Sequence, residues 1–459
     1  MVEPKLRQAV AKYVREHQDE FIERLKRFCR QPSVSSQDLG IDEMRELVLR
    51  ELQADGVATR VLPCETAPPV YGELQAGRSK TILLYNHFDV QPPEPLAEWT
   101  TPPFEPTVRD GRLYARGATD NKGNIVARLS ALQAIKHVIG EYPINVKFLI
   151  DGEEEVNSPS LPALAREYRD LLEADWVLWE DTLREGDVPV ISLGSKAICT
   201  LELRCKTAST DFHSAFAGVY PSAAWRMVHA LASMKDADGK ILIDGFYDDV
   251  RKPSLAFQKL QKEQPEVDLE AITKKFGIRR FVGNVGAQDF RRQYVASPTC
   301  NISGVISGYT GKGSKNVLPA EARARVDMRL VPDQDAQKAY ELLCRHLKKR
   351  GFDDIEVIPD RYGSKASMSA IDERALDVLV KAVECGYGCK PIVESISSGG
   401  TPMWIAAEIL GKPVMAFGVG HPSHRTHAPN ENVMLSEFSA QILTMAEFFL
   451  GLGTDGGTA

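Results

Sequence analysis

Acidic side chains and imidazoles follow four apolar stretches of the sequence, at the point where each stretch ends. "TILLYN" leads into His87 and Asp89, "INVKFLI" into Asp151 and the glutamates 153–155, "DWVLW" into Glu180 and Asp181, and "PVMAFGVG" into "HPSHRTHAPNE". Carboxylates and imidazoles are the ligands that Zn²⁺ or Mn²⁺ accepts in proteins. Two such ions that share a bridging carboxylate form a common hydrolytic centre.

The acidic side chains need a compensating positive charge. Three consecutive glutamates repel one another, and burial strengthens that repulsion. A solvated strand end explains any one of these positions, but it does not easily explain all of them together. A further acid, Asp120, stands in "RGATDNKGN" just before a helical stretch, where a helix N-cap is the alternative role. We therefore expect metal ions to neutralise the cluster.

The apolar stretches have the length of buried strands and alternate with helices. The strands are predicted at 80–86, 144–150, 175–179 and 412–420, and an amphipathic helix at 124–139 separates the first two. Continuous apolar strands separated by helices predict a mostly parallel α/β sheet with helices on both faces. In such sheets ligands bind beyond the carboxyl ends of the strands. The acids and imidazoles should therefore meet at one edge.

A second pattern occupies the middle of the chain. Residues 197–206 and 321–332 alternate apolar and polar side chains, each is followed by a helical stretch, and a further strand is predicted at 355–360. The charged segment at about 235–297 predicts a helical insertion. We expect an α+β domain over 196–362, inserted between two parts of a catalytic domain at 1–195 and 363–459.

Composition excludes some classes of protein. The chain has 459 residues and a formal net charge of −7, which argues against a nucleic-acid binder. No apolar run reaches membrane-spanning length. The charged, amphipathic N-terminal stretch differs from a secretion signal, so we expect a cytoplasmic protein. The eight cysteines are scattered and complete no zinc-binding pattern.

Nine short motifs resemble those of the co-catalytic di-metal aminopeptidase-like hydrolases. This family includes carnosine-type dipeptidases, glutamate carboxypeptidases, aminoacylases and succinyl-diaminopimelate desuccinylase. The motifs are "NHFDVQP", "GATDNKG", "DGEEE", "WEDT", "ISLGSKA", "DFHSAFAG", "KNVLPAEARARVDMRLVP", "SSGGTP" and "THAPNE". They run in family order from residue 86 to residue 431, and "HFDVQP" favours the dipeptidase branch. The resemblance implies a ferredoxin-like inserted domain that acts as a lid and joins a homodimer.

The resemblance also implies a set of site residues. Two divalent ions, Zn or Mn, would be held by His87, Asp120 as the bridge, Glu155, Asp181 and His427. Asp89 would orient the His87 imidazole. Glu154 would be the general base and Glu153 a solvated neighbour, although a one-residue slip in this triplet would also place two acids at the site. Glu180, adjacent to Asp181, is the alternative ligand at that position.

Three residues resemble substrate-binding positions of the family. They are His213 for the oxyanion, Arg329 for a substrate carboxylate and Thr401 for a hydroxyl contact. The sequence departs from the family at three points. Ala215 follows His-Ser where most relatives have glycine, a serine at 397 or 398 replaces a common arginine, and 360–368 contains no histidine. These departures leave the choice of substrate more open than the hydrolytic chemistry.

The expected reaction is metal-dependent hydrolysis of an amide bond in dipeptides or short peptides with a free terminal carboxylate. An N-acyl-amino-acid deacylase or a glutamate-type carboxypeptidase would use the same centre. A different class of protein, an inactive peptide-binding relative, is the other alternative. The presence of the expected ligands and of Glu154 argues against that last alternative.

Overall fold

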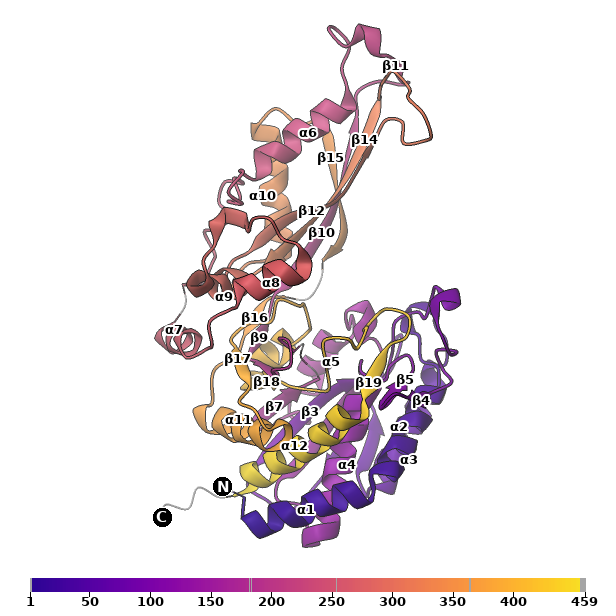
Figure 1. Ribbon diagram of the computed structural model, residues 1–459, viewed down its shortest axis with the longest axis vertical. Helices are drawn as coiled ribbons and strands as arrows, with labels where there is room; N and C mark the ends of the chain where they lie inside the picture. Colours follow the sequence, from indigo (N-terminus) through magenta and orange to yellow (C-terminus); the bar gives the residue numbers. More distant parts are fainter. Residues whose placement is uncertain (1, 181, 183, 253, 363–364, 455–459) are drawn as a thin grey trace. The chain divides into compact units, whose positions relative to one another are not determined.

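The structure is a computed structural model that describes residues 2–180, 182, 184–252, 254–362 and 365–454 (Figure 1). The chain divides into two compact units. Unit 1 comprises Met1–Gly194, Ser369–Glu394 and Pro402–Ala459, and unit 2 comprises Ser195–Met368 and Ser395–Thr401. The short strands β9 (Gly194–Ser195) and β16 (Ser367–Met368) stand where the chain passes between the units.

Unit 1 is built on an eight-stranded sheet of order β1-β2-β6-β3-β7-β18-β8-β17. The strands are β1 (Ala58–Val61), β2 (Val70–Leu74), β3 (Thr81–His87), β6 (Asn145–Asp151), β7 (Trp176–Trp179), β8 (Val190–Ser192), β17 (Ile392–Glu394) and β18 (Val414–Ala416). The central strands β6, β3, β7 and β18 are parallel neighbours. Their carboxyl ends therefore share one edge of the sheet, as the sequence predicts. β1–β2, β2–β6 and β18–β8 are antiparallel, so the sheet is mixed.

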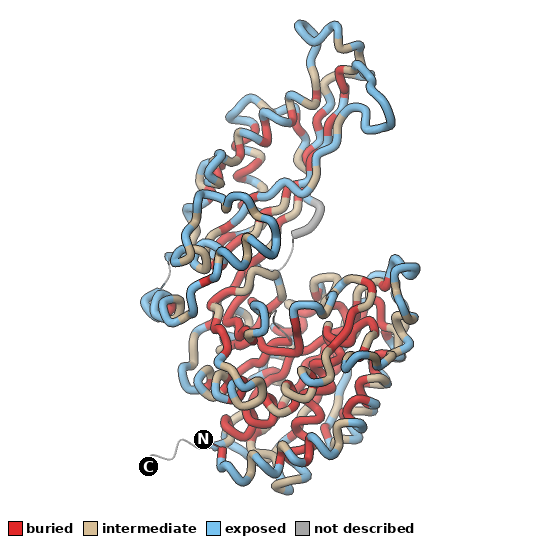
Figure 2. The backbone as a smooth tube through the Cα atoms, viewed as in Figure 1, coloured by how far each residue is buried: buried red, intermediate tan, exposed pale blue. Residues whose placement is uncertain are grey.

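Helices cover both faces of this sheet. They are α1 (Pro4–Glu16), α2 (Gln18–Arg30), α3 (Ile41–Ala54), α4 (Lys122–Ile139), α5 (Leu161–Glu167), α11 (Glu373–Tyr387), α12 (Leu435–Gly453) and a π-helix, η6 (Ile405–Leu410). α4 packs against β3, α1, α2 and α12. On the other face, α5 and η6 form one apolar cluster with Leu83, Tyr85 and Trp179. Figure 2 shows the central strands of this sheet as mostly buried.

Shorter elements complete unit 1. They are the three-stranded sheet of β4 (Thr107–Arg109), β5 (Arg112–Tyr114) and β19 (Asn432–Met434), and the 3₁₀ helices η1 (Ser35–Gln37), η2 (Leu96–Glu98) and η3 (Glu154–Val156). Within the described residues, no helix is both long and apolar enough to cross a bilayer. The cytoplasmic location stays a prediction.

Unit 2 has an antiparallel four-stranded sheet of order β12-β14-β10-β15. The strands are β10 (Ala197–Lys206), β12 (Thr299–Ser307), β14 (Glu321–Leu330) and β15 (Ile355–Tyr362), and the helices α6 (Ala223–Met234) and α10 (Ala336–Lys349) cover one face. Burial alternates along β10 and β14, so the other face is open. With β10, α6, β12, β14, α10 and β15 in chain order, the topology is ferredoxin-like, which confirms the predicted fold class.

The remaining elements of unit 2 lie in its insertion and around His213. The insertion contains α7 (Leu255–Lys262), α8 (Leu269–Phe276), η5 (Val282–Asn284) and α9 (Ala287–Ala296). β11 (Phe212–His213) pairs with β13 (Val317–Leu318), and η4 (Ser214–Phe216) follows β11. The segment between α6 and β12 is therefore helical, as predicted.

Candidate metal centre

Three neighbouring strands of unit 1 deliver polar side chains to the same edge. His87 is the last residue of β3 and lies opposite Asp151, the last residue of β6. Glu180 directly follows β7. After β6 the chain turns at Gly152, where a Cβ atom would lie 2.6 Å from the ring of Phe88. Only glycine fits this close approach, and it lets the chain bring the glutamates of η3 toward β3.

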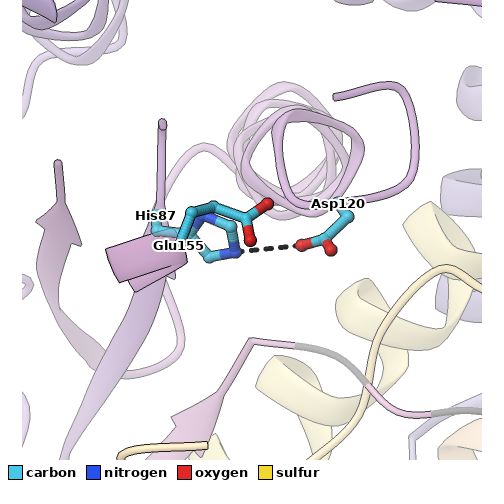
Figure 3. A group of neighbouring side chains, drawn as sticks. All are labelled: His87, Asp120 and Glu155. Carbon is cyan, nitrogen blue, oxygen red and sulfur yellow. Dashed lines mark hydrogen bonds and ion pairs between the residues drawn. The ribbon is translucent and has the colours of Figure 1, made fainter. Parts of the chain in front are cut away.

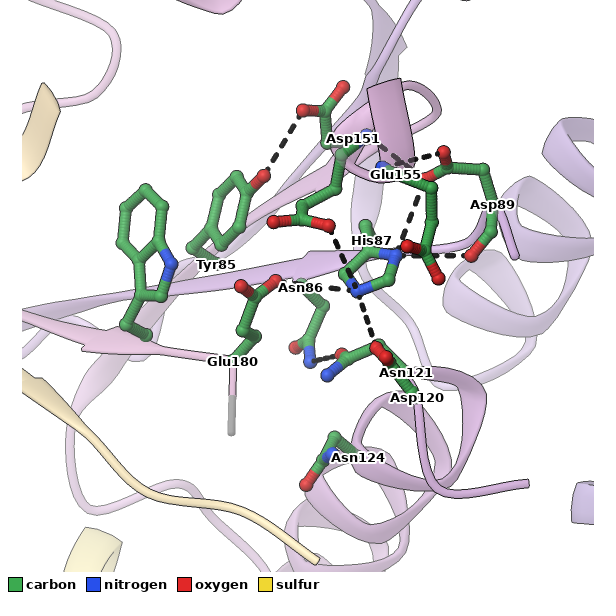
Figure 4. A network of polar contacts seen from close by, with 12 residues as sticks. Tyr85, Asn86, His87, Asp89, Asp120, Asn121, Asn124, Asp151, Glu155 and Glu180 are labelled. Atoms are coloured by element: carbon green, nitrogen blue, oxygen red, sulfur yellow. Dashed lines mark hydrogen bonds and ion pairs between the residues drawn. The ribbon is translucent and has the colours of Figure 1, made fainter. Parts of the chain in front are cut away.

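Asp89 joins the β3 histidine to the glutamate turn. Its buried carboxylate accepts hydrogen bonds from the backbone N–H groups of Glu154 (3.1 Å) and Glu155 (3.0 Å) and from the Ser35 hydroxyl (2.6 Å). Asp89 Oδ1 also lies 3.3 Å from His87 Nδ1 (Figure 4). The contact with Asp89 occupies His87 Nδ1 and leaves Nε2 to face the other acids. This is the geometry expected if Asp89 orients the imidazole.

The Asp120 carboxylate lies between two imidazoles. Its Oδ1 is 3.0 Å from His87 Nε2, and its Oδ2 is 3.0 Å from His427 Nε2. Each carboxylate oxygen thus faces a different histidine, although the two histidines are 340 residues apart in the sequence. Figure 3 shows Asp120 with His87 and Glu155. A carboxylate in this position can bridge two cations.

The surrounding acids divide between the two imidazoles. Glu155 Oε2 is 3.2 Å from His427 Nε2, whereas Glu180 Oε2 is 3.5 Å and Glu154 Oε2 4.0 Å from His87 Nε2. The potential ligand atoms of His87, Asp120 and Glu155 all lie within 4.8 Å of one another, and so do those of His87, Glu154 and Glu180. Two overlapping groups of oxygen and nitrogen ligands are therefore present.

The structure describes four of the five predicted metal ligands. The structure brings together four of the five predicted ligands, His87, Asp120, Glu155 and His427, with Glu154 beside them. The fifth, Asp181, lies outside the described residues, and its neighbour Glu180, the alternative, belongs to the cluster.

The prediction that Glu153 is a solvated neighbour was wrong. Its side chain is 2% exposed, and its carboxylate accepts hydrogen bonds from the Thr66 hydroxyl and from Ser160 N–H. The Glu153 carboxylate thus accepts a hydrogen bond from the backbone N–H of Ser160 in the following turn, a structural contact that the charge pattern does not reveal. Acidic character alone did not separate this glutamate from its two neighbours.

The electrostatics of the cluster favour bound cations. Burial raises the pKa of Glu154 well above its ordinary value and also raises the pKa of Glu155. Burial opposes protonation of His427, yet hydrogen bonds to Asp120 and Glu155 raise its pKa to about 11. Without metal, the buried carboxylates thus depend on protons for compensation. Divalent cations can replace those protons, and the mixed oxygen and nitrogen donors fit two of them.

Glu431 fixes the loop that carries Asp120. Its fully buried carboxylate accepts hydrogen bonds from the backbone N–H groups of Gly117 (2.9 Å), Thr119 (3.0 Å) and Asp120 (3.1 Å), and from the guanidinium of Arg116 (2.7 Å). Sequence reasoning used Glu431 only to recognise the "THAPNE" motif and missed this role. The available signal was the position of an acid four residues after the predicted ligand His427.

The predicted substrate-binding residues all belong to unit 2. His213 Nδ1 accepts a hydrogen bond from Ala215 N–H, and the residue lines an open hollow of about 1030 Å³ with Asp211, Lys315 and Asn316. Arg329 lies on β14 and has no ion-pair partner in the described part of the chain. The buried Thr401 hydroxyl likewise finds no hydrogen-bond partner among the described residues.

At the carboxyl ends of the parallel strands, the imidazoles of His87 and His427 contact the same carboxylate, that of Asp120. Such an arrangement is typical of metal-dependent hydrolases. Residues 83–451 match the model of peptidase family M20/M25/M40, and the chain belongs to this family of metallopeptidases. The dipeptidase branch suggested by "HFDVQP" is confirmed by the relatives that follow.

Two curated relatives are similar over nearly the whole chain. The Beta-Ala-His dipeptidase of Rattus norvegicus is 28% identical and the alignment covers 96% of this chain and 94% of the relative. The Cys-Gly metallodipeptidase dug1 of Schizosaccharomyces pombe is 28% identical, with 92% and 93% covered.

Two solved structures share the fold. The M20 family metallo-carboxypeptidase Sso-CP2 from Sulfolobus solfataricus is 33% identical, with a TM-score of 0.84 and coverage of 95% of this chain and 99% of that one. Human carnosine dipeptidase 1 is 26% identical, with a TM-score of 0.81 and coverage of 98% and 99%.

Proposed function

We propose that the protein hydrolyses dipeptides or short peptides that carry a free terminal carboxylate. The observation that carries this proposal is the Asp120 carboxylate, whose two oxygens face His87 and His427, with Glu154 beside the same cluster. The dipeptidase names of the curated relatives support the substrate class.

The side chains of unit 1 would divide the work at this centre. His87 and Asp120, with Asp181 or Glu180, would hold one divalent cation, and Asp120, Glu155 and His427 would hold the other. Bound Zn²⁺ or Mn²⁺ would polarise the scissile carbonyl and lower the pKa of a water molecule. Glu154 takes the proton of the attacking water and then gives it to the leaving amine.

We propose that three side chains of unit 2 contact the substrate. Because His213 Nδ1 accepts a hydrogen bond, its ring proton is placed on Nε2, which can then donate to an oxyanion. Arg329, without a carboxylate partner in the described residues, suits the terminal carboxylate of a peptide. The Thr401 hydroxyl would supply a further hydrogen bond to the substrate.

Removal of metal tests the proposed function. With added Mn²⁺ or Zn²⁺ the purified protein is expected to release free amino acids from dipeptides, chelation should abolish the reaction, and either ion should restore it. Amino-acid release measured by chromatography follows each step, and chelator already saturated with Mn²⁺ is the control. Metal binding without turnover of any dipeptide or N-acyl amino acid would favour an inactive peptide-binding protein instead.

A carboxypeptidase is the second candidate, because Sso-CP2, which is named a metallo-carboxypeptidase, is 33% identical over 95% of this chain. The missing histidine in "DRYGSKASM" also removes a feature expected of carnosine-type dipeptidases. Dipeptides with a free or a blocked amino group distinguish the candidates, because a carboxypeptidase also cleaves the blocked ones. Cleavage restricted to N-acyl amino acids would identify a deacylase.

We also propose that the protein forms a homodimer through unit 2. β12 is an edge strand that pairs only with β14 in the described chain, and it exposes Val305 and Ile306. Trp225 and Val228 are exposed on α6 of the same unit. An apolar edge strand readily pairs with another chain, so a second copy can extend the sheet.

Substituting Ile306 with aspartate is expected to convert the dimer to a monomer, since the charge would have to be buried in the interface. Ile306 is 60% exposed in the single chain, so the substitution should leave folding of the monomer intact. Sedimentation equilibrium measures the mass. Leu255→Asp, at a residue 84% exposed on α7, is the matched control and should not change it. An unchanged dimer in Ile306→Asp would exclude this interface.

A further inference from the structure

Arg128 places a positive charge in the middle of the apolar helix α4. The residue is fully buried, and its neighbours Ala127 and Leu129 are buried too. A buried arginine is costly unless its donors are satisfied. The guanidinium donates to six oxygen acceptors, of which five are backbone carbonyls and one is the side-chain carbonyl of Asn86.

The acceptors lie at the carboxyl ends of three parallel strands. At β3 they are Tyr85 O (2.6 Å) and Asn86 Oδ1 (2.6 Å). At β7 they are the carbonyl oxygens of Leu178 (3.4 Å), Trp179 (2.6 Å) and Glu180 (3.0 Å), and just beyond β18 it is Phe417 O (3.5 Å). One side chain thus cross-links β3, β7 and β18 where their ladders end.

Two of these contacts involve residues of the metal cluster or their direct neighbours. Asn86 directly precedes His87, and the Glu180 carbonyl belongs to the residue whose carboxylate faces His87. Asn86 Nδ2 donates to Asn121 Oδ1, and Asn121 directly follows Asp120 (Figure 4). Arg128 therefore holds the backbone beside His87 and Glu180. It is also linked to the Asp120 loop through the side-chain amides of Asn86 and Asn121.

A second polar residue on the same face of α4 supports this arrangement. Asn124, one turn before Arg128, donates to Thr119 O (3.1 Å) and accepts from Val419 N–H (2.7 Å). The Asp120 loop is thus tied at this point to the segment that follows β18. Only a guanidinium has enough donors, in a planar fork, to join several strand ends at once; an ammonium group is a compact point charge.

We propose that Arg128 is a positioning residue that sets the spacing of His87, Asp120 and Glu180 for metal binding. The inference rests on the proposed function, because it concerns the same centre. Metal ligands depend on the groups that orient them, and loss of such a group typically costs 10–100-fold in metal affinity or activity. Arg128 acts on the ligands through strand ends and touches neither the metal nor the substrate.

The test compares Arg128→Lys and Arg128→Met with wild type. We expect the Mn²⁺ dissociation constant, measured by titration calorimetry of the metal-free protein, to rise by roughly 10–100-fold in both variants. The visible spectrum of the Co²⁺-loaded protein should change, and kcat should fall with little change in KM. The lysine variant keeps the charge, so a similar loss there assigns the effect to the geometry of the fork.

Arg24 provides the matched control. It is also a buried arginine of unit 1, but its partners Glu51 and Asp55 lie at α3 and carry no proposed ligand. Arg24→Lys should lower the thermal unfolding temperature and leave Mn²⁺ affinity and the Co²⁺ spectrum unchanged. If Arg128→Met does not fold, Arg128→Lys and Asn86→Ala carry the comparison, because the latter removes the Asn86 links to Arg128 and Asn121 and leaves the Arg128 contacts to β7 and β18 in place.

Folded variants with wild-type Mn²⁺ affinity, Co²⁺ spectrum and kcat would overturn the inference. Its failure is distinct from failure of the proposed function. A wild-type protein that binds Mn²⁺ but cleaves no peptide would refute the peptidase proposal, while the affinities of the Arg128 variants would still decide whether this residue positions the ligands.

Discussion

Replacement of Glu154 with glutamine should lower kcat about 10²–10⁴-fold, the usual contribution of a general base, while both metal ions stay bound. Glutamine has the shape of glutamate but cannot take a proton from water. Glu154 Oε2 lies 4.0 Å from His87 Nε2, and partial burial of the side chain raises the pKa of its carboxyl well above the ordinary value. Steady-state kinetics on a cleaved dipeptide, together with the metal content of the purified variant, measure the two effects separately.

Glu153→Gln is the control for Glu154→Gln, because it makes the same chemical change one residue away. The Glu153 carboxylate is engaged by Thr66 and by the backbone of Ser160, so its loss should affect stability more than kcat. A near-normal rate in Glu154→Gln would remove Glu154 from its role. A slow Glu153→Gln enzyme beside a fast Glu154→Gln enzyme would shift the register of the triplet by one residue.

Replacement of Asp120 with asparagine should weaken the binding of both metal ions and abolish turnover. Asp120 is the only described carboxylate with one oxygen facing His87 and the other facing His427. An amide offers one neutral oxygen in place of two charged ones, so the loss of affinity should exceed the roughly 10–100-fold caused by removing an outer partner. Calorimetric titration with Mn²⁺ gives the affinity and the number of ions bound.

Asp151→Asn is the matched control for Asp120→Asn. Asp151 is a buried aspartate at the same sheet edge, and it accepts hydrogen bonds from Tyr85 and Ser158. Burial raises its pKa to about 7, so its carboxyl is partly protonated at neutral pH and a neutral amide is a modest change. This variant should still bind two Mn²⁺ ions. An Asp120→Asn protein that binds both ions with wild-type affinity would exclude the bridging role.

The sequence predicted those features of the fold and site that follow from a periodic residue pattern together with a general rule of topology. Apolar strands separated by helices predicted the parallel strands of unit 1, and the rule that sites lie beyond their carboxyl ends placed His87, Glu155 and His427 near one another. The alternating patterns of β10 and β14 likewise predicted a sheet with one open face. These predictions depend on the average properties of whole segments, so one atypical residue does not change them.

The remaining features depend on the path of the backbone. The Glu180 carboxylate faces His87 because of the way in which the chain leaves β7, and the sequence pattern does not predict that path. His427 adopts a left-handed conformation (φ +61°), as do Arg425 and Asn430 in the same loop. Non-glycine residues rarely do so. No local propensity predicts such a loop.

The sequence contains a signal that Arg128 has a structural role, although the sequence analysis did not identify it. It interrupts the apolar stretch "NIVARLSALQAI", and a charge at that point of a buried helix requires acceptors inside the protein. The acceptors are strand-end carbonyls from three strands, which only the folded sheet brings together. The pattern thus indicated that a partner must exist but could not identify it.

The contact between Asp120 and His427 joins segments that the ribosome makes on either side of unit 2. During synthesis the first segment must wait for roughly three hundred further residues, a delay of about 15–60 s at 5–20 residues per second, before the second imidazole emerges. Metal binding that involves both imidazoles thus has to wait until His427 has been made, and nascent fragments that end within unit 2 carry no His427 with which to complete the pair.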